Sequence, residues 1–523
     1  LVFSRVARCS SSSQATSSIM MRFYSSTMRC CFSTTPPPNT ATEQNVLATA
    51  RERYTTPHAI WEALSTDNVK LLRASYLVKL AGEDRVLCRR QELPPDAFIG
   101  VEELKSLYGD GNRDGVLPVL SVSFCWDTPP HPDPSGKQVA TVAAALEREM
   151  PKYAKMGFAE MGVFWDWAAL YQKDPALFDW TKTPEAKPEG PERDAFLEDL
   201  KEKRAFYGGE AYEQSRTPEQ KEAFGRALHN TMDLWYAHQG TTVYLLTQLP
   251  KGTRRKLGYD DSGWTTYERR SAEQIKKVYL YEAEWKLVRD LGSDDFESGG
   301  AGSRNWPLDP DGFDELIESK QFTNGADKGT VKTLYRKMSK AQLSGIEMLD
   351  FTGILAPSVR DMEQLCRCLN LCENLKTCDL QHVGLADDAC RALFSTLKVN
   401  AVLKILDLER NKIGNTGATA IAKALRGNEV LTNLNLCGND IGPKGGVAIG
   451  EALAVNGVLK TLNLSHNQLC GVDFMGRGTY SVVGITALAE ALKVNGVLTT
   501  LDISYNRIGD EGTKAIGEAL AVN

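Results

Sequence analysis

The chain has 523 residues, more than one ordinary domain needs, so two or three folded units are expected. Hydrophobic residues make up 42% and charged residues 24% of it, the proportions of a soluble globular protein. The net charge of −6 argues against a nucleic-acid binder, and the absence of an apolar run of about 18 residues argues against a membrane-spanning helix.

Residues 1–42 contain several arginines, many serines and no acidic residue before Glu43. This composition is typical of an organelle transit peptide and predicts a mitochondrial or plastid location. The alternative is a Ser-rich disordered tail, or untranslated sequence, on a cytoplasmic protein. The sequence starts at Leu1 rather than Met and stops at Asn523 without a polar cap for the last repeat, so we expect it to be a fragment. In either case residues 1–43 are expected to lie outside the folded domains.

Residues 44–340 predict an α/β domain. Helices are expected from 44 to 108, and apolar strands over 116–124, from Met161 and from Thr241, with further helices after each strand. A long polar insertion covers about 173–216. Strand–helix alternation with apolar strands indicates a parallel sheet covered by helices, and ligands of such sheets bind at the carboxyl ends of the strands.

The residues at those strand ends form an ordered set: Ser123-Phe124-Cys125-Trp126, then Trp165-Asp166 with Gln172 beyond, then Gly263-Trp264-Thr265 with Glu268. The set resembles the fungal heterokaryon-incompatibility (HET) domain. Three departures stand out. Phe124 replaces a Tyr of the family pattern, Ser262 replaces its Arg, and its middle Ile is missing.

The HET family is thought to be a remote relative of Toll/interleukin-receptor (TIR) domains, some of which cleave NAD with a catalytic Glu. The resemblance implies an NAD-hydrolase-like activity in which Glu268 or Asp166 stabilises a cationic ribosyl transition state. The alternative is that the tryptophans are core residues and that Asp166 satisfies buried backbone groups. We favour this alternative, and with it a protein that is not an enzyme.

Neither a metal nor a cofactor is expected. Cys366, Cys368 and Cys372 are close in sequence, but they lie on a predicted helix without the paired Cys-x-x-Cys spacing of zinc sites. The twelve cysteines show no paired framework, which favours free thiols in a reducing compartment. No Walker-A sequence is present, so the nucleotide-driven switch of NOD-like receptors is missing.

From about residue 341 to 523 the sequence repeats. One leucine pattern recurs as LKTCDLQHVGL from Leu375, LKILDLERNKI from Leu403, LTNLNLCGNDI from Leu431, LKTLNLSHNQL from Leu459 and LTTLDISYNRI from Leu498, and the last four copies share a late Asn. The first three steps are 28 residues and the last is 39, so 11 residues have been added. With a weaker copy from Ile346, we expect about six strand–helix units.

At this repeat length the pattern resembles the ribonuclease-inhibitor subfamily of leucine-rich repeats, as found in NOD-like receptors. The resemblance implies a horseshoe-shaped α/β solenoid with a concave parallel sheet and a convex helical back. Asn411, Asn439, Asn467 and Asn506 are expected at the turns, where a buried amide satisfies backbone groups of its own coil and the next.

Strand positions that alternate with the leucines face outward. The candidate binding residues on this concave face are Asp379, Asp407, Glu409, Asn435, Asn463 and Asp502. They predict a protein partner, and hence a recognition or scaffold protein in immune-like or regulatory signalling. The alternatives are a face that is merely solvated, and an effector enzyme whose NAD-hydrolase-like domain is regulated by the repeats.

The added residues lie within 470–481, between a strand and its helix. Insertions in solenoids emerge as loops on one rim, and such loops often bind. Phe474, Arg477 and Tyr480 give this loop apolar anchors and charge. The alternative is a tolerated surface loop.

Overall fold

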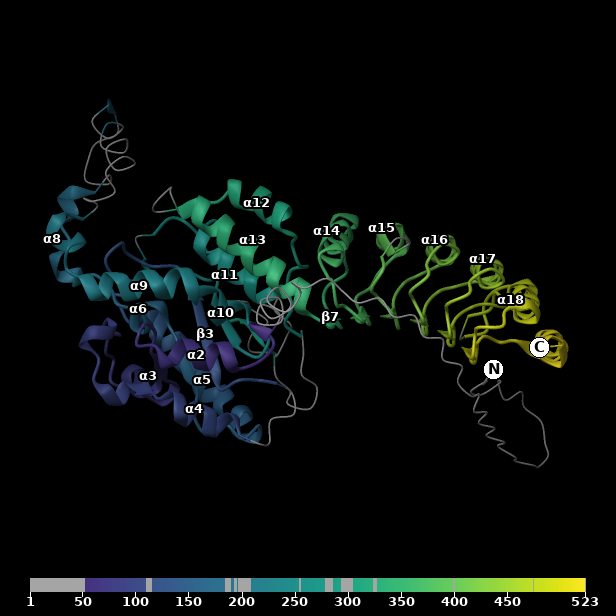
Figure 1. Ribbon diagram of the computed structural model, residues 1–523, viewed down its shortest axis with the longest axis horizontal. Coiled ribbons are helices and arrows are strands. Elements are labelled where there is room, and N and C mark those ends of the chain that lie inside the picture. The colour runs from purple at the N-terminus through teal and green to yellow at the C-terminus, as the bar shows by residue number, and fades with distance from the viewer. Residues whose placement is uncertain are drawn as a thin grey trace, which may run out of the picture.

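The computed structural model describes residues 52–109, 115–183, 190, 191, 195, 208–253, 255–277, 286–292, 304–322, 327–397, 400–473 and 475–522. Within them the chain is a mixed α/β protein with two six-stranded sheets (Figure 1). The predicted leader, part of the predicted insertion at 173–216, and Phe474 lie outside the described residues.

The first sheet has the order β2-β1-β4-β3-β5-β6. Its strands are β1 (Leu71–Arg73), β2 (Phe98–Ile99), β3 (Val119–Phe124), β4 (Gly162–Phe164), β5 (Thr242–Leu246) and β6 (Val288–Asp290). The four strands β4, β3, β5 and β6 are parallel, which confirms the predicted parallel strands near 116, 161 and 241. The antiparallel pair β1 and β2 was expected to be helical, and this prediction was wrong.

Helices cover both faces of this sheet, which we call with its helices the amino-terminal unit (Figure 1). They are α2 (His58–Ser65), α3 (Ala74–Gly82), α4 (Val101–Tyr108), α5 (Lys137–Lys155), α6 (Asp166–Ala169), α8 (Glu210–Glu213), α9 (Pro218–Asn230), α10 (Met232–Ala237), α11 (Gly263–Glu273), α12 (Pro310–Glu318) and α13 (Asp327–Gly345). Four short 3-10 helices also lie in the described part: η1 (Arg90–Glu92), η2 (Pro95–Ala97), η3 (Pro175–Leu177) and η4 (Trp180–Lys182).

The central strand β3 is buried along its whole length because each of its faces meets a different helical layer. Leu120 and Val122 belong to the core that contains Val142 of α5. Val119 and Cys125 belong to the core that contains Trp235 of α10 and residues of α11. Burying each such side chain contributes about 1.5–3 kcal/mol. The polar residues of this second face therefore need internal partners, a point that matters for the candidate acids below.

The second sheet has the order β12-β11-β10-β9-β8-β7, with every neighbouring pair parallel and in register. Strands and helices alternate as β7 (Met348–Asp350), α14 (Val359–Asn370), β8 (Thr377–Asp379), α15 (Asp387–Leu397), β9 (Ile405–Asp407), α16 (Asn415–Leu425), β10 (Asn433–Asn435), α17 (Pro443–Leu453), β11 (Thr461–Asn463), α18 (Val483–Val494), β12 (Thr500–Asp502) and α19 (Gly509–Val522). The six predicted strand–helix units are thus present in this order.

The middle residue of each strand is buried beneath the helices, for example Leu406 in β9, while the two flanking residues are partly exposed. We call the side that carries these flanking residues the open face. The helices stand in a row on the other side (Figure 1). Gly450 allows helices α17 and α18 to approach each other closely, because a Cβ at this position of α17 would lie 2.7 Å from the backbone of Ala487 in α18.

Helix α13 connects the two sheets, and one core cluster contains both its Tyr335 and Leu349 of β7. Gln342 Nε2 of α13 donates to the carbonyl oxygen of Ala237 at 2.6 Å. Trp306 Nε1 donates to the carbonyl oxygen of Leu355 in the first repeat at 3.1 Å. These contacts fix the first repeat against the amino-terminal unit.

Candidate functional site

Six side chains occupy the same strand position on the open face, one in each repeat. They are Asp350, Asp379, Asp407, Asn435, Asn463 and Asp502, and the strand register pairs each one directly with the next. We call this set the Asx row. The structure therefore brings five of the six predicted open-face residues into one line and adds Asp350, which the sequence analysis did not single out.

The Asx row also has a structural role that the sequence analysis missed. In each repeat the side-chain Oδ1 accepts a hydrogen bond from the backbone N–H two residues later, at 2.9 to 3.0 Å. Asp and Asn are favoured at such positions because their short side chains reach the backbone of the following turn. One side-chain oxygen of each residue is thus used to shape the turn, which leaves one other polar side-chain atom for further contacts.

The first three repeats carry an acidic stretch of the Asx row. Burial raises the pKa of Asp379, and the neighbouring carboxylates of Asp350 and Asp407 raise it further. Burial and the carboxylate of Glu409 also raise the pKa of Asp407. Asn435 Nδ2 donates to Asp407 Oδ2 at 3.1 Å and to Glu409 Oε2 at 3.2 Å. A cationic group placed over this stretch would stabilise its ionised carboxylates.

Two large apolar side chains accompany these carboxylates. Met348 in β7 and Ile405 in β9 lie two residues before the Asx row on the same open face, and 42% and 40% of their surfaces are exposed. The outward direction of Ile405 follows from the alternation of residues along its strand. Met348 was not singled out, because the first repeat matches the repeat pattern weakly.

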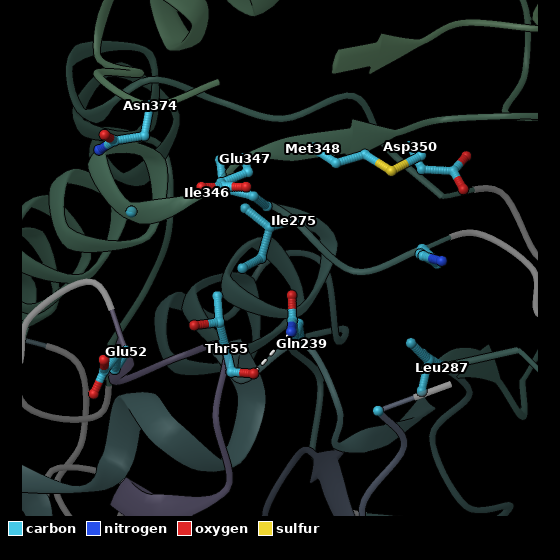
Figure 2. A pocket seen from close by; sticks show the side chains of 13 residues that line it. Glu52, Thr55, Gln239, Ile275, Leu287, Ile346, Glu347, Met348, Asp350 and Asn374 are labelled. Atoms are coloured by element: carbon cyan, nitrogen blue, oxygen red, sulfur yellow. Dashed lines mark hydrogen bonds between the residues drawn. The ribbon is translucent and has the colours of Figure 1, made fainter. Parts of the chain in front are cut away.

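A cavity of about 630 Å³ adjoins this end of the open face. Figure 2 shows Ile346, Glu347 and Met348 of the first repeat on one side of it and Thr55 and Gln239 of the amino-terminal unit on the other. Gln239 Nε2 donates to the carbonyl oxygen of Thr55 at 2.9 Å and thereby fixes that wall. No sequence motif predicts this cavity, because its wall joins residues that are far apart in the chain.

The turn asparagines form a ladder. In Asn439, Nδ2 donates to the carbonyl oxygens of Leu408 and Leu436, while Oδ1 accepts from the N–H of Ile413. Asn411, Asn467 and Asn506 bond in the same way. The predicted bonds to backbone are confirmed, but the second coil is the preceding one, not the next.

A second asparagine ladder was missed. Asn428, Asn456 and Asn495 each use Nδ2 to reach a carbonyl oxygen at the end of the previous repeat's helix. Their Oδ1 atoms accept two backbone N–H groups at the start of the next strand segment. The signal available in the sequence was an Asn that recurs three residues before the leading Leu of the last four copies.

The residues that follow the strands form a third line, which we call the rim row: Gly353, His382, Arg410, Gly438, His466 and Tyr505. All six have positive φ, between 53° and 75°. This conformation costs a residue with a side chain roughly 1–2 kcal/mol, and glycine escapes the cost. Arg410 Nη1 lies 3.1 Å from Nε2 of His382, and the rings of His466 and Tyr505 stack with centroids 4.0 Å apart.

The insertion is anchored to its own repeat and to the last one. The Asp473 carboxylate accepts from the N–H of Met475, the N–H of Arg477 and Arg477 Nε at 2.8 to 2.9 Å. Tyr480 donates its hydroxyl to the carbonyl oxygen of Ile508 at 2.7 Å. Arg477 and Tyr480, both predicted to bind, are exposed but already hold the loop together.

The predicted catalytic acids lie in the amino-terminal unit, near the carboxyl ends of β3 and β4. Glu268 is buried and accepts a hydrogen bond from Ser123 Oγ at 2.6 Å, and burial raises its pKa well above the usual range. Burial raises the pKa of Asp166 to about 6, although Trp126 Nε1 donates to its carboxylate at 3.0 Å. The Asp166 charge also raises the pKa of Glu268, so the structure brings the two acids together.

Arg255 also reaches the carboxyl end of β3, although the sequence analysis did not single it out. Its Nη2 donates to Ser262 Oγ at 2.6 Å and its Nη1 to the carbonyl oxygen of Trp126 at 2.9 Å. These two bonds bring a guanidinium to the carboxyl end of β3. The cavity at the first repeat includes none of Ser123, Asp166 or Glu268.

Neither a membrane-spanning helix nor a metal centre is present among the residues that the structure describes. No helix among them combines the length and hydrophobicity needed to cross a membrane. No group of three or more His, Cys, Asp and Glu side chains among them has an arrangement that would hold a metal ion. Cys366 instead donates its thiol toward the carbonyl oxygen of Ala392, inside the helical layer.

The comparisons with known proteins bear on the repeats. The Leucine Rich repeat family profile matches residues 399–422, 427–450 and 494–517. The chain carries leucine-rich repeats. No curated protein sequence matches the chain. Among solved structures, "Leiomodin-1 Actin-Binding Site 2 (ABS2)" is similar at 27% identity over 32% of this chain and 90% of its own, with a TM-score of 0.27.

Proposed function

We propose that the leucine-rich repeats bind another protein through the open face of the first three repeats. The observation that carries this proposal is the exposure of Met348 and Ile405 beside the carboxylates of Asp379, Asp407 and Glu409. Protein interfaces combine a few large apolar anchors with surrounding polar groups, and solenoids generally use their extended sheet surface for binding. No comparable pair of apolar side chains is seen in the described strands of the later repeats.

The partner should present basic side chains around an apolar one. The carboxylates of the Asx row are held in place by their turn hydrogen bonds, so little side-chain entropy is lost when a cation binds. Complementary charge chiefly increases the association rate and the specificity of such a complex. The adjoining cavity offers space for one further side chain of the partner.

A recognition or scaffold role follows from this proposal. The proposal includes three finer points. The repeats form a horseshoe-shaped solenoid, they resemble those of ribonuclease inhibitor and NOD-like receptors, and the protein takes part in immune-like or regulatory signalling. The fixed contact between the first repeat and the amino-terminal unit supports a scaffold, because a partner on the open face would be held at a set position relative to that unit.

The test compares two double variants of the full chain. Met348→Ser with Ile405→Ser removes the apolar anchors of the open face. Val455→Ser with Val494→Ser removes two apolar side chains, 63% and 69% exposed, at the ends of the repeat helices. Proteins captured by the unmodified chain are purified and their Kd values measured against all three chains.

We expect the open-face variant to weaken binding of at least one basic partner about tenfold or more, and the helix-end variant to bind it as the unmodified chain does. Equal Kd values for all three chains, or no partner with measurable affinity, would contradict the proposal. Circular dichroism of the variants checks that the fold is intact.

A second candidate is the NAD-hydrolase-like activity of the amino-terminal unit. The observation in its favour is the convergence of Glu268, Asp166 and Ser123 at the carboxyl ends of two parallel strands. The internal hydrogen bonds of both acids favour a structural role instead. Incubation of the full chain with NAD tests it. Turnover that disappears in Glu268→Gln would support the candidate, and no turnover would remove it.

A further inference from the structure

The rim row has a gap. Planar or long side chains occupy it at His382, Arg410, His466 and Tyr505, but Gly438 lies between Arg410 and His466. The same register position is filled in four repeats of this chain, so the fold itself accepts side chains there. The repeat of Gly438 therefore contributes no side chain between those of Arg410 and His466, and we call this place the slot.

The side chains of Arg410 and His466 border the slot, and each also contacts a side chain of the repeat on its other side. Arg410 Nη1 faces His382 Nε2 at 3.1 Å, while its aliphatic stem borders the slot, since its Cγ would lie 3.1 Å from a Cβ at position 438. On the other side the imidazole of His466 stacks on Tyr505 at an angle of 13°. One imidazole face is thus covered by Tyr505, and the opposite side of His466 is the one toward the slot.

The width of the slot suits one aromatic ring. Neighbouring strands lie about 4.8 Å apart, so residues two repeats apart are separated by roughly 9.6 Å. Stacked rings prefer centroid separations of about 4.5 Å or more. Two such contacts in succession therefore span about the distance between residues two repeats apart. The stack of His466 on Tyr505 shows that adjacent repeats of this rim do place rings face to face.

The chemistry of the walls also favours an aromatic occupant. The flat apolar body of Trp, Tyr or Phe suits the methylene stem of Arg410 on one side, and its ring can stack on the imidazole of His466 on the other. An aliphatic side chain would gain the apolar contact but not the stacking.

From these relations we infer that the slot at Gly438 receives an aromatic side chain of the protein partner. The inference rests on the proposed function, because it deepens the same binding surface. Glu409 of the open face and Arg410 of the rim row are consecutive residues. A segment lying over the acidic repeats would thus place its aromatic side chain one repeat beyond them.

N-acetyl-tryptophanamide serves as the probe, with N-acetyl-leucinamide as the aliphatic control. The full chain is labelled at histidine Cε1, which gives six signals for its six histidines. Those of His382 and His466 are assigned with His382→Asn and His466→Asn. Because the slot binds a single side chain, we expect saturation only at millimolar probe, with an upfield ring-current shift of the His466 signal. The leucine analogue should produce no such shift.

Two matched glycine variants decide where the probe binds. Gly438→His fills the slot with the residue type found at this position in two other repeats, at φ values of 55° and 53°. Gly353→His makes the same change at the same register position in the first repeat, where a Cβ would meet nothing within 4 Å. Loss of the His466 shift in Gly438→His, with its retention in Gly353→His, would support the inference.

An unshifted His466 signal, or equal shifts in both variants, would overturn the inference. Gly438→Asn, which tolerates positive φ well, repeats the test if the histidine variant fails to fold. The two proposals fail separately. If Met348→Ser with Ile405→Ser still abolishes partner binding while the probe does not bind, only the aromatic slot is wrong. If no partner binds, the proposed function is wrong whatever the probe does.

Discussion

Asn439 donates a hydrogen bond from Nδ2 to the carbonyl oxygen of Leu408 one repeat earlier, at a distance of 3.0 Å. The same amide also accepts the N–H of Ile413, so a single side chain satisfies both kinds of backbone group of the preceding coil. The asparagine ladder therefore connects consecutive repeats, in addition to their paired strands, their apolar core and the second asparagine ladder.

Asn439→Ala should destabilise the chain by about 2–4 kcal/mol, because it leaves buried backbone donors and acceptors without partners. Urea denaturation followed by circular dichroism measures the change. Asn433→Ala in the same repeat is the matched control, since Asn433 is partly exposed on the open face and should cost less than about 0.5 kcal/mol. Equal losses in both variants would contradict the role given to the ladder.

Replacing Asp379 and Asp407 together by Asn should raise the free energy of unfolding at pH 7, because neither side chain then carries a charge that the folded chain disfavours. Asn keeps the Oδ1 acceptor of the turn, as Asn435 and Asn463 do at the same position. Both carboxyls have pKa values raised in the folded state, so their contribution to stability falls as pH rises through those values.

The free energy of unfolding that the double Asn variant gains should therefore decrease at pH values below the pKa of the two carboxyls. There the carboxyls of the unmodified chain are protonated in the folded and the unfolded state alike. Urea midpoints at pH 7 and pH 3.5 measure this difference. The corresponding double Ala variant should lose stability at both pH values, because the turn hydrogen bonds disappear. A double Asn variant that is destabilised at pH 7 would contradict the raised pKa values.

Asp166→Asn should change the pH dependence of the amino-terminal unit. The pKa of Asp166 is raised to about 6, so ionisation between about pH 4 and pH 6 destabilises the folded chain, by at most about 3 kcal/mol. His131, with its pKa lowered to about 4 by burial, acts in the opposite direction over this range and is present in both chains. The difference between the chains therefore reports on Asp166 together with Glu268, whose pKa the Asp166 charge raises.

Relative to the unmodified chain, Asp166→Asn should become progressively more stable from pH 4.5 to pH 7.5. Tryptophan fluorescence in urea follows this transition, because Trp126 and Trp167 both contact the Asp166 carboxylate. If the free energies of unfolding of the two chains changed in parallel with pH, Asp166 would be ionised throughout this pH range. Its pKa would then not be raised.

Tyr480→Phe should loosen the insertion without unfolding the repeat. Loss of the hydrogen bond to Ile508 costs about 1 kcal/mol, which corresponds to roughly fivefold more frequent opening of the loop. Trypsin cleavage after the exposed Arg477 should accelerate by that factor. Tyr505→Phe removes a hydroxyl from the stacked ring of the rim row and should leave the cleavage rate unchanged. Similar rates in all three chains would show that Tyr480 does not hold the loop.

The sequence by itself determined the repeats, the parallel strands near 116, 161 and 241, and the outward row of polar side chains. Each follows from a local rule: leucine periodicity fixes which residues face the core, and the period of two in a strand fixes which residues face away. The turn asparagines were predictable for the same reason, since a buried amide at a fixed repeat position must satisfy backbone groups.

Tertiary structure alone decided what those residues contact. Leu71–Arg73 pairs with β4 as a strand although the surrounding sequence has a helical pattern, because the sheet edge supplies hydrogen-bond partners that lie about ninety residues away. The Asx row shapes its own turns, Arg255 reaches Ser262, and the gap at Gly438 opens between Arg410 and His466. Each of these is a distance between atoms of different segments, and the order of residues along a chain does not contain such distances.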